Sequence, residues 1–269
     1  MRCVGIFLLL GGCVLSPHMV FPDNHPAGGR SAGLAHASVV LRDMWCFHHN
    51  QAGLANVENH GLGLYHRAGY LKEMDHQSLF FLFPVASGGM AASCSCYGYE
   101  HYQQIKVGFA YGRWLGKNFS AVIQLDYFRT RISGCPGRVD ALSFEAGVQF
   151  RVNAQWLVAA HFFNPLTWEV TGNDHFLPSI FRVGAGWQPA GPWLMLVEVE
   201  KELERPAVPK LALEHELAPG LFLRTGISWN PVLQCFGLGY CWKGFQLDLA
   251  FCVHPYLGSE PNFSLSYVF

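Results

Sequence analysis

A strict alternation of apolar and polar residues is the feature of this sequence that most constrains its fold. In the stretch ALSFEAGVQFRVN, which begins at Ala141, one face carries Leu142, Phe144, Ala146, Val148, Phe150 and Val152, and the other Ser143, Glu145, Gly147, Gln149 and Arg151. Successive side chains of a β-strand point to opposite sides, so a period of two over this length indicates a strand with one apolar and one polar face. The stretches NFSAVIQLDY and FQLDLAF repeat the pattern.

Segments of this kind cover the chain from about residue 61 to its end. We expect about fourteen strands, at residues 61–69, 77–86, 90–98, 102–115, 119–132, 139–152, 155–163, 179–188, 192–203, 208–217, 220–228, 234–242, 245–253 and 262–269. Turn-forming groups such as Gly116-Lys117-Asn118 and Gly134-Cys135-Pro136-Gly137 separate them. An even number of such strands, each about 9–11 residues long, is typical of outer-membrane barrels.

Composition decides between lipid and water as the surroundings of these strands. Hydrophobic residues make up 51% of the chain and charged residues 14%, against about 25% charged in a soluble domain. No run reaches the roughly 18 apolar residues of a membrane-spanning helix. A soluble β-sandwich is the alternative, but the polar faces are rich in Gly and Ser. Aromatic residues near strand ends also resemble an interfacial girdle: Tyr111, Trp114, Tyr127, Trp187, Trp193, Trp229, Tyr240 and Trp242.

The chain ends on one more alternating segment, NFSLSYVF. Phe263, Leu265, Tyr267 and Phe269 share one face. A terminal strand that closes on an aromatic residue resembles the signal read by the outer-membrane assembly machinery. We therefore expect an all-β transmembrane antiparallel barrel over residues 61–269, with that machinery and membrane lipid as partners.

The first residues indicate export. The stretch MRCVGIFLLLGGCVLS has one arginine and a short apolar core, so residues 1–20 are expected to be a signal peptide. The sequence LGGC, Leu10 to Cys13, resembles a lipoprotein processing site, with ordinary secretion as the alternative. Together with a barrel, the signal predicts a Gram-negative outer membrane as the location.

Residues 21–60 precede the first strand and are expected to lie inside the barrel. About fourteen strands enclose more space than side chains alone fill, so the lumen needs a plug or a channel. Val40, Met44 and Phe47 are spaced as on a short amphipathic helix, with Ser38 as its N-cap and Gly53 ending it or turning the chain.

This segment resembles the start of the FadL-like outer-membrane barrel superfamily, especially its PorV/PorQ-type branch. Members open on a Gly- and Ala-rich segment and a short helix, followed by an Asn-Pro/Gln-Ala-Gly-Leu-Ala motif. The matching residues here are Asn50, Gln51, Ala52, Gly53, Leu54 and Ala55, with Gln51 in place of the commoner proline. The resemblance implies a fourteen-stranded barrel with its N-terminal segment in the lumen.

Histidines and cysteines are numerous, but their spacing predicts no metal site. His48 and His49 have no third ligand at a suitable spacing, so a buried or rim-facing hydrogen-bonding role is expected. The seven cysteines after the signal are irregularly spaced, and most are expected to be small apolar fillers. A hydrolase would need a set drawn from residues such as His161, His175 and His254, yet no G-x-S-x-G signature is present. We expect no catalytic residue and no cofactor.

The polar face carries a charge pattern. Glu198, Glu200 and Glu202 alternate along one expected strand, and Glu214 and Glu216 lie on the next. The neighbouring strands place two arginines on the same side, which predicts a lumen network of Arg182, Glu198, Glu200, Glu214 and Arg224. Structural packing against the plug is favoured over ligand binding.

The sequence is compatible with three functions, and its net charge argues against a fourth, nucleic-acid binding. A charge of −1 without a basic block argues against nucleic acid. The resemblance implies binding or transport of hydrophobic small molecules, with the plug, Ser38 to Asn56, and the polar lumen row as the important parts. The alternative is a PorV/PorQ-type accessory of type IX secretion with protein partners. An outer-membrane lipid-modifying enzyme is the third hypothesis.

Overall fold

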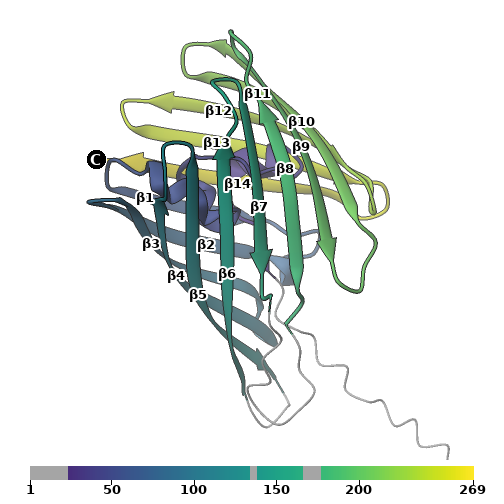
Figure 1. Cartoon of the computed structure of the whole chain (residues 1–269). Helices are drawn as coiled ribbons and strands as arrows, with labels where there is room; N and C mark the ends of the chain where they lie inside the picture. The colour runs from purple at the N-terminus through teal and green to yellow at the C-terminus, as the bar shows by residue number, and fades with distance from the viewer. Residues whose placement is uncertain (1–23, 134–137, 166–176) are drawn as a thin grey trace, which may run out of the picture.

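The barrel consists of fourteen strands. The structure, a computed structural model, describes residues 24–133, 138–165 and 177–269. Each strand pairs antiparallel with its neighbours in the sequence, and β1 pairs with β14 to close the sheet (Figure 1). The strands are β1 (Gly61–Arg67), β2 (His76–Val85), β3 (Gly88–Tyr99), β4 (Tyr102–Trp114), β5 (Phe119–Ile132), β6 (Arg138–Arg151), β7 (Trp156–Phe163), β8 (Ile180–Trp187), β9 (Trp193–Glu202), β10 (Val208–Ala218), β11 (Leu221–Ser228), β12 (Leu233–Trp242), β13 (Phe245–His254) and β14 (Gly258–Val268). The predicted fold class is confirmed.

The apolar faces of the strands point outward. In β5, Ile123 and Leu125 are 55% and 64% exposed, whereas Gln124 and Asp126 are each 1% exposed. The same inversion holds around the barrel, where large apolar side chains such as Phe109, Val197, Leu238 and Phe251 are exposed. A sandwich would bury these faces, so the soluble alternative is wrong. An apolar surface of this extent requires contact with lipid.

One member of the expected aromatic girdle faces the lumen instead. Trp114 shares a face with Ala110, which is buried, and Arg42 from inside the barrel lies over its ring. The reason is the period of two itself: Tyr111 and Trp114 are three residues apart, so they lie on opposite faces.

The chain before β1 fills the lumen, and we call residues 24–60 the plug (purple in Figure 1). It contains a short helix, α1 (Gly29–Gly33), and two 3-10 turns, η1 (Met44–His48) and η2 (Gln51–Asn56). Its apolar residues form three clusters with the wall, one around Trp45 and Phe80, one around Leu34 and Leu196, and a small one in which Ala35 packs against Cys235 and Cys252. Residues 1–20, the expected signal peptide with Cys3, Cys13 and the expected processing site, lie outside the described residues.

The expected helix starting at Ser38 is wrong. The chain turns after Ser38, and η1 begins at Met44 with Asp43 as its N-cap, whose side chain accepts a hydrogen bond from the Trp45 N–H. Gly53 lies within η2 rather than at a helix end. A Cβ at Gly53 would lie 2.7 Å from the Cβ of Cys46, so this close approach requires glycine.

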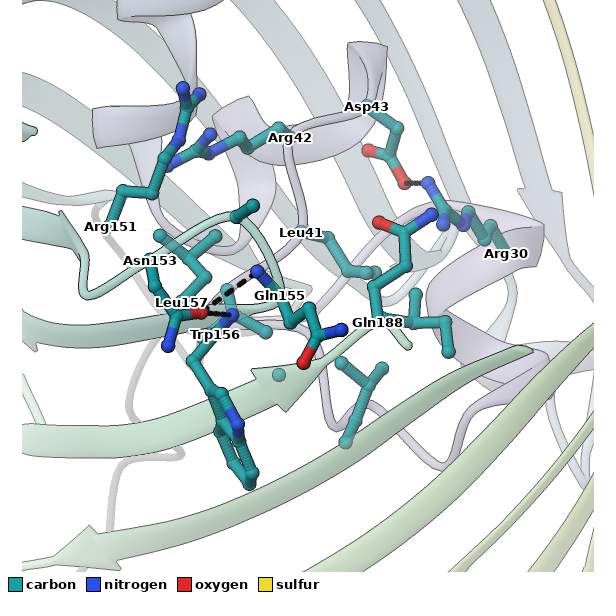
Figure 2. A pocket seen from close by; sticks show the side chains of 15 residues that line it. Arg30, Leu41, Arg42, Asp43, Arg151, Asn153, Gln155, Trp156, Leu157 and Gln188 are labelled. Atoms are coloured by element: carbon teal, nitrogen blue, oxygen red, sulfur yellow. Dashed lines mark hydrogen bonds and ion pairs between the residues drawn. The ribbon is translucent and has the colours of Figure 1, made fainter. Parts of the chain in front are cut away.

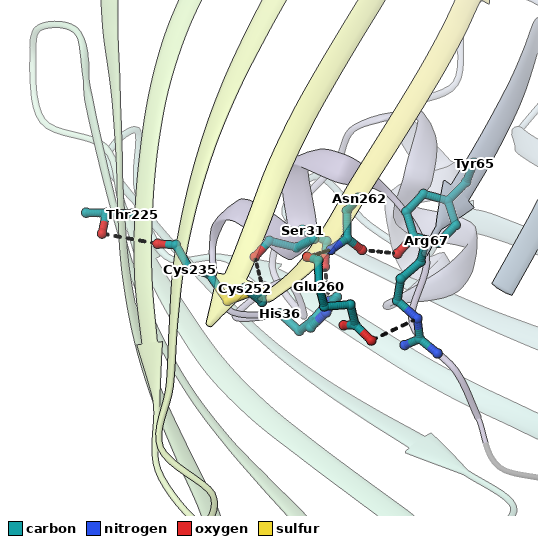
Figure 3. Close-up of a disulfide and its surroundings, with 10 residues drawn as sticks. Ser31, His36, Tyr65, Arg67, Thr225, Cys235, Cys252, Glu260 and Asn262 are labelled. Atoms are coloured by element: carbon teal, nitrogen blue, oxygen red, sulfur yellow. Dashed lines mark hydrogen bonds and ion pairs between the residues drawn. A yellow bond between two sulfur atoms is a disulfide. The ribbon is translucent and has the colours of Figure 1, made fainter. Parts of the chain in front are cut away.

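Two of the cysteines expected to be fillers form a disulfide. Cys235 and Cys252 lie opposite each other on β12 and β13 and are joined (Figure 3). The free cysteines among the described residues are Cys46, Cys94, Cys96 and Cys241. Cys135 and His175 lie outside the described residues.

The two ends of the barrel differ in their connections. One end, here called the turn end, has the connections 86–87, 115–118, 152–155, 188–192, 219–220 and 243–244. The other, the loop end, has 68–75, 100–101, 133–137, 164–179, 203–207, 229–232 and 255–257. Among the described residues, no helix is long and apolar enough to cross a bilayer.

We predict that Leu125→Arg lowers the free energy of unfolding in lipid vesicles by about 2–4 kcal/mol, because Leu125 lies midway along β5 on the outer face. Chemical unfolding followed by tryptophan fluorescence measures the change. Leu203→Arg, at an exposed position of the loop end, is the matched control and should cost about 1 kcal/mol or less. Equal effects at both positions would contradict a lipid-facing belt.

Candidate functional site

Asn50 connects the plug to two wall strands. Its side-chain NH2 group lies 3.0–3.3 Å from the backbone carbonyl oxygens of Val39, Val148 and Ala160. Val148 and Ala160 are partners on β6 and β7. A Cβ at Gly147 would lie 2.1 Å from the Asn50 Oδ1, so glycine makes room for this side chain. Asn50 is fully buried, and its hydrogen bonds fix where the plug meets the wall.

The rest of the family-like motif is buried as well. Residues Gln51, Ala52, Gly53, Leu54 and Ala55 form most of η2, and Asn50 is its N-cap through a hydrogen bond from the Ala52 N–H. The motif therefore shapes the base of the plug and offers little surface to a solute.

A buried carboxylate, Glu145, joins this region to the polar lumen row. It accepts hydrogen bonds from Gln51 Nε2 at 2.6 Å, from Lys106 Nζ at 2.6 Å and from Gln124 Nε2 at 3.1 Å, and His161 Nε2 lies 2.9 Å away. A buried charge is costly without such partners. Lys106 also bonds to the plug through Asn24.

His48 and His49 are both buried in the plug. His48 Nε2 lies 2.9 Å from Ser78 Oγ on β2, whereas neither ring nitrogen of His49 has a hydrogen-bond partner among the described residues. Burial, and then the charge of Lys106, lowers the pKa of His48 to about 3; burial, and then His48, lowers the pKa of His49. Both rings are therefore neutral near pH 7. No group of three or more His, Cys, Asp or Glu in the described part of the chain is arranged to hold a metal.

The structure brings the five residues of the expected charge network onto the lumen face, in two groups. Arg182 donates to Glu200 at 2.7 Å, and Lys210 bonds to Glu198 and Glu200 at 2.9 Å each. The other Glu198 oxygen accepts the backbone N–H groups of Ser38 and Val39 in the plug.

The second group lies on β10, β11 and β13. Arg224 bonds to Glu214 at 2.6 Å and to Asp248 at 2.7 Å. Arg30 of the plug binds both oxygens of Glu214 and also contacts Asp43 at 3.2 Å. The network thus holds the plug as well as the wall.

Sequence reasoning missed four partners in these groups, namely Lys210, Asp248, Arg30 and Asp43. Lys210 is four residues before Glu214 and Asp248 lies in an alternating strand, so the period of two places both on the lumen face. Arg30 lies before the first strand, where no period relates it to the wall.

Two cavities lie at opposite ends of the plug. The turn-end cavity has a volume of about 550 Å³ and is lined by Leu41, Arg42, Arg151, Leu157 and Gly186, among others (Figure 2). The loop-end cavity has about 410 Å³ and is lined by His36, His49, Ile180, Arg182 and Lys210, among others.

The inner face of β8 runs from one cavity to the other. Ile180 and Arg182 line the loop-end cavity and Gly186 lines the turn-end cavity. Between them lies Gly184, where a Cβ would be 2.7 Å from the Val39 Cγ1 of the plug. Val39 packed on Gly184 therefore separates the two cavities along β8.

The histidines considered for an enzyme lie apart in the fold. His161 is buried in the Glu145 group, whereas His254 is at the loop end of β13 and accepts the N–H groups of Tyr256 and Leu257. The C-terminal residues lie on the outer face: Phe263, Tyr267 and Phe269 are exposed and Leu265 is half-buried. The Phe269 N–H bonds to the carbonyl oxygen of His60, the residue before β1.

The fold is similar to those of three solved transport proteins. They are the Ralstonia pickettii toluene transporter TbuX (TM-score 0.69, 12% identity, covering 90% of this chain and 98% of that chain), the P. putida toluene transporter TodX (0.68, 11%, 92% and 99%) and the CymD monoaromatic hydrocarbon channel (0.66, 12%, 90% and 97%). At these identities the likeness concerns the fold. No family model matches the chain, and no curated protein does.

We predict that Arg182→Glu lowers the free energy of unfolding in detergent by about 3–5 kcal/mol, because it leaves Glu200 and Glu198 beside a third carboxylate in a buried site. The reversal Arg205→Glu breaks an exposed ion pair with Glu202 and should cost less than about 1 kcal/mol. Chemical unfolding curves of the two variants decide the comparison, and equal midpoints would show that the lumen network contributes no stability.

Proposed function

We propose that this protein is an outer-membrane channel for hydrophobic small molecules, in which the plug forms the gate. The observation that supports this most strongly is the pair of cavities, one at each end of a plug held inside a fourteen-stranded barrel. The same fold occurs in two toluene transporters and a monoaromatic hydrocarbon channel. These observations support the assignment of the protein to the FadL-like channels.

The orientation follows from the connections. Outer-membrane barrels have short periplasmic turns and longer extracellular loops. The turn end therefore faces the periplasm, and the loop-end cavity receives solute from outside. In the proposed domain organisation, residues 1–20 are the signal, 21–60 the periplasmic or plug segment and 61–269 the barrel.

Movement of an apolar solute needs no chemical step. The driving force is partition between the two cavities, and the barrier is the part of the plug that touches β8. Among the described residues, β8 has no hydrogen bond to the plug, and the Val39 side chain meets Gly184 through apolar contact. The Val39 backbone is held by Glu198 and Asn50, so the motion that breaks apolar contacts alone is a rotation of the Val39 side chain away from Gly184. The polar lumen row keeps the rest of the plug in place.

The proposed alternative is an accessory of type IX secretion related to the PorV/PorQ branch. Such a protein needs a large surface for cargo proteins at the loop end. Most connections there are short, and 164–179 is the longest, so we place this function second. Co-purification with a secreted cargo domain would promote it. A lipid-modifying enzyme is placed third, because His161 and His254 lie apart.

The proposed function is tested by hydrocarbon uptake. Cells of a Gram-negative host without its own hydrocarbon channel, producing the protein in the outer membrane, should take up labelled toluene faster than cells with an empty vector. Uptake of a hydrophilic sugar should stay at the empty-vector level, because the plug closes the lumen to water-soluble compounds. Toluene uptake equal to that of the empty vector, at equal protein levels, would contradict the proposal.

We further predict that Val39→Ala raises the toluene uptake rate by up to about tenfold. The substitution removes two buried methyl groups, each of which contributes roughly 0.8 kcal/mol to the contact with Gly184 that must break for the solute to pass. Val57→Ala is the matched control, since Val57 is also a plug valine but packs in the Trp45 cluster beside Gly89. An equal rise in both variants would show a general loosening of the plug rather than a route along β8.

A further inference from the structure

Two arginines at the turn end differ from the other lumen-facing cations that the structure describes. Each of those others has a carboxylate oxygen within 3.4 Å: Arg30, Arg67, Lys106, Arg182, Lys210 and Arg224. Arg42, in the plug, and Arg151, at the end of β6, have no ion-pair partner among the described residues. Arg42 is half-buried and Arg151 is exposed at the mouth of the turn end, and neither has a carboxylate partner in the described part of the chain.

Both guanidinium groups lie over the same ring. The Cζ atoms of Arg42 and Arg151 are each 5.7 Å from the centre of the Trp114 ring. Arg42 Nε donates to Gln149 Oε1 at 3.0 Å, but its Nη2 is buried with no hydrogen-bond partner in the described part of the chain. Burial, and then the charge of Arg151, lower the pKa of Arg42 to about 10.

The two arginines line a cavity that has both polar and apolar walls, and its other polar residues are Asn153, Gln155, Gln188 and the ion pair of Arg30 with Asp43. The turn-end cavity of about 550 Å³ has Leu157, Leu194 and Leu196 on the barrel side. Figure 2 shows the two guanidinium groups on one side of the cavity and Gln188 on the other, with Leu41 between them. Such a volume is in the range of small-molecule sites, in which a few polar groups orient an otherwise apolar ligand.

We propose that the turn-end cavity is a binding site for an anion with an apolar body, of the size of an aromatic carboxylate. The carboxylate lies between Arg42 and Arg151, and the apolar part packs against Leu157, Leu194 and Leu196. Arginine is suited to this role because its fork of N–H donors matches a carboxylate. This inference names a solute class for the proposed channel, and it rests on that function only for movement through the barrel.

The site joins the gate to the wall. Arg42 belongs to the plug and Arg151 to β6, so one anion bonded to both replaces their repulsion by attraction. Occupancy of the site therefore holds the turn end of the plug, near Val39, against the barrel. An anionic solute arriving at this cavity regulates the gate that it passes.

Binding is measured on the purified full chain in a neutral detergent, without added lipid. Isothermal titration with 4-phenylbutyrate should show one site on the wild type. The neutral isostere 4-phenylbutyramide should bind at least about tenfold more weakly, since it lacks the charge that strengthens the hydrogen bonds. Inorganic phosphate, which lacks an apolar body, should bind equally weakly.

The double variant Arg42→Gln/Arg151→Gln should lose at least about tenfold in affinity for 4-phenylbutyrate. Its matched control is Arg113→Gln/Lys117→Gln, which removes the same charge from exposed positions at the same end and should bind like the wild type. Removing an unpaired like-charge pair should leave the melting temperature unchanged or raise it, so failure to fold is not expected. The ligand should raise the melting temperature of the wild type and of the control, but not of the Arg42/Arg151 variant.

Three outcomes would overturn the proposal. The first is equal affinity for the acid and the amide, and the second is an equal loss of affinity for the acid in the control variant. The third is saturable binding of anionic phospholipid to the protein in nanodiscs, with a bound lipid that the acid does not displace. The last outcome would assign the arginines to a lipid headgroup. Toluene uptake separates this inference from the proposed function. Carboxylate binding without uptake refutes the channel alone, and uptake without carboxylate binding refutes the site alone.

Discussion

The rest of the structure depends on one constraint, the closed ring of backbone hydrogen bonds that the pairing of β1 with β14 completes. In hydrocarbon, a sheet has to close because its edge groups find no water. Closure turns the polar faces of fourteen strands inward, around more space than their side chains fill. Each polar group in that space then needs a partner. The plug supplies many of them, for instance the Ser38 and Val39 N–H groups for Glu198 and the Gln51 amide for Glu145. Barrel and plug therefore satisfy one another's hydrogen bonds.

The buried ion pairs determine position more than they add stability. Replacing a buried pair by apolar residues is often neutral, whereas removing one partner is costly, because the remaining charge is left without compensation. Arg30 shows the consequence for the plug: its guanidinium fits only where both Glu214 oxygens and Asp43 are in reach. Displacement of α1 by one turn would leave the Arg30 guanidinium in the lumen without a carboxylate partner. The charges thus fix the register of the plug against the wall.

The period of two explains how much the sequence alone reveals. It predicts the strands and assigns Arg182, Glu198 and Glu200 to one face, since parity is independent of the partner strand. The disulfide could have been predicted in the same way. Trp242 and Phe245 flank the turn between β12 and β13, Cys235 lies seven residues before Trp242, and Cys252 lies seven residues after Phe245, so the two cysteines face each other. The path of the plug could not have been predicted, because its 3-10 turns have no periodic pattern and their geometry depends on wall groups. Asp43, not Ser38, caps η1, and the choice depends on contacts with distant strands.

The contacts of the plug are distributed unevenly, and this bears on how it opens. Asn50 holds it to β6 and β7, Glu198 and Lys210 hold it to β9 and β10, and Arg30 holds it to β10. Between these anchors lies β8, whose glycines meet the plug through apolar contacts, Gly184 with Val39 and Gly186 with Val40. A hydrogen bond lost inside a barrel leaves unpaired polar atoms, whereas an apolar contact that opens can be refilled by an apolar solute. The two cavities meet the plug along this strand. The opening of the lumen that costs the least free energy is therefore also the one that a hydrophobic molecule can fill.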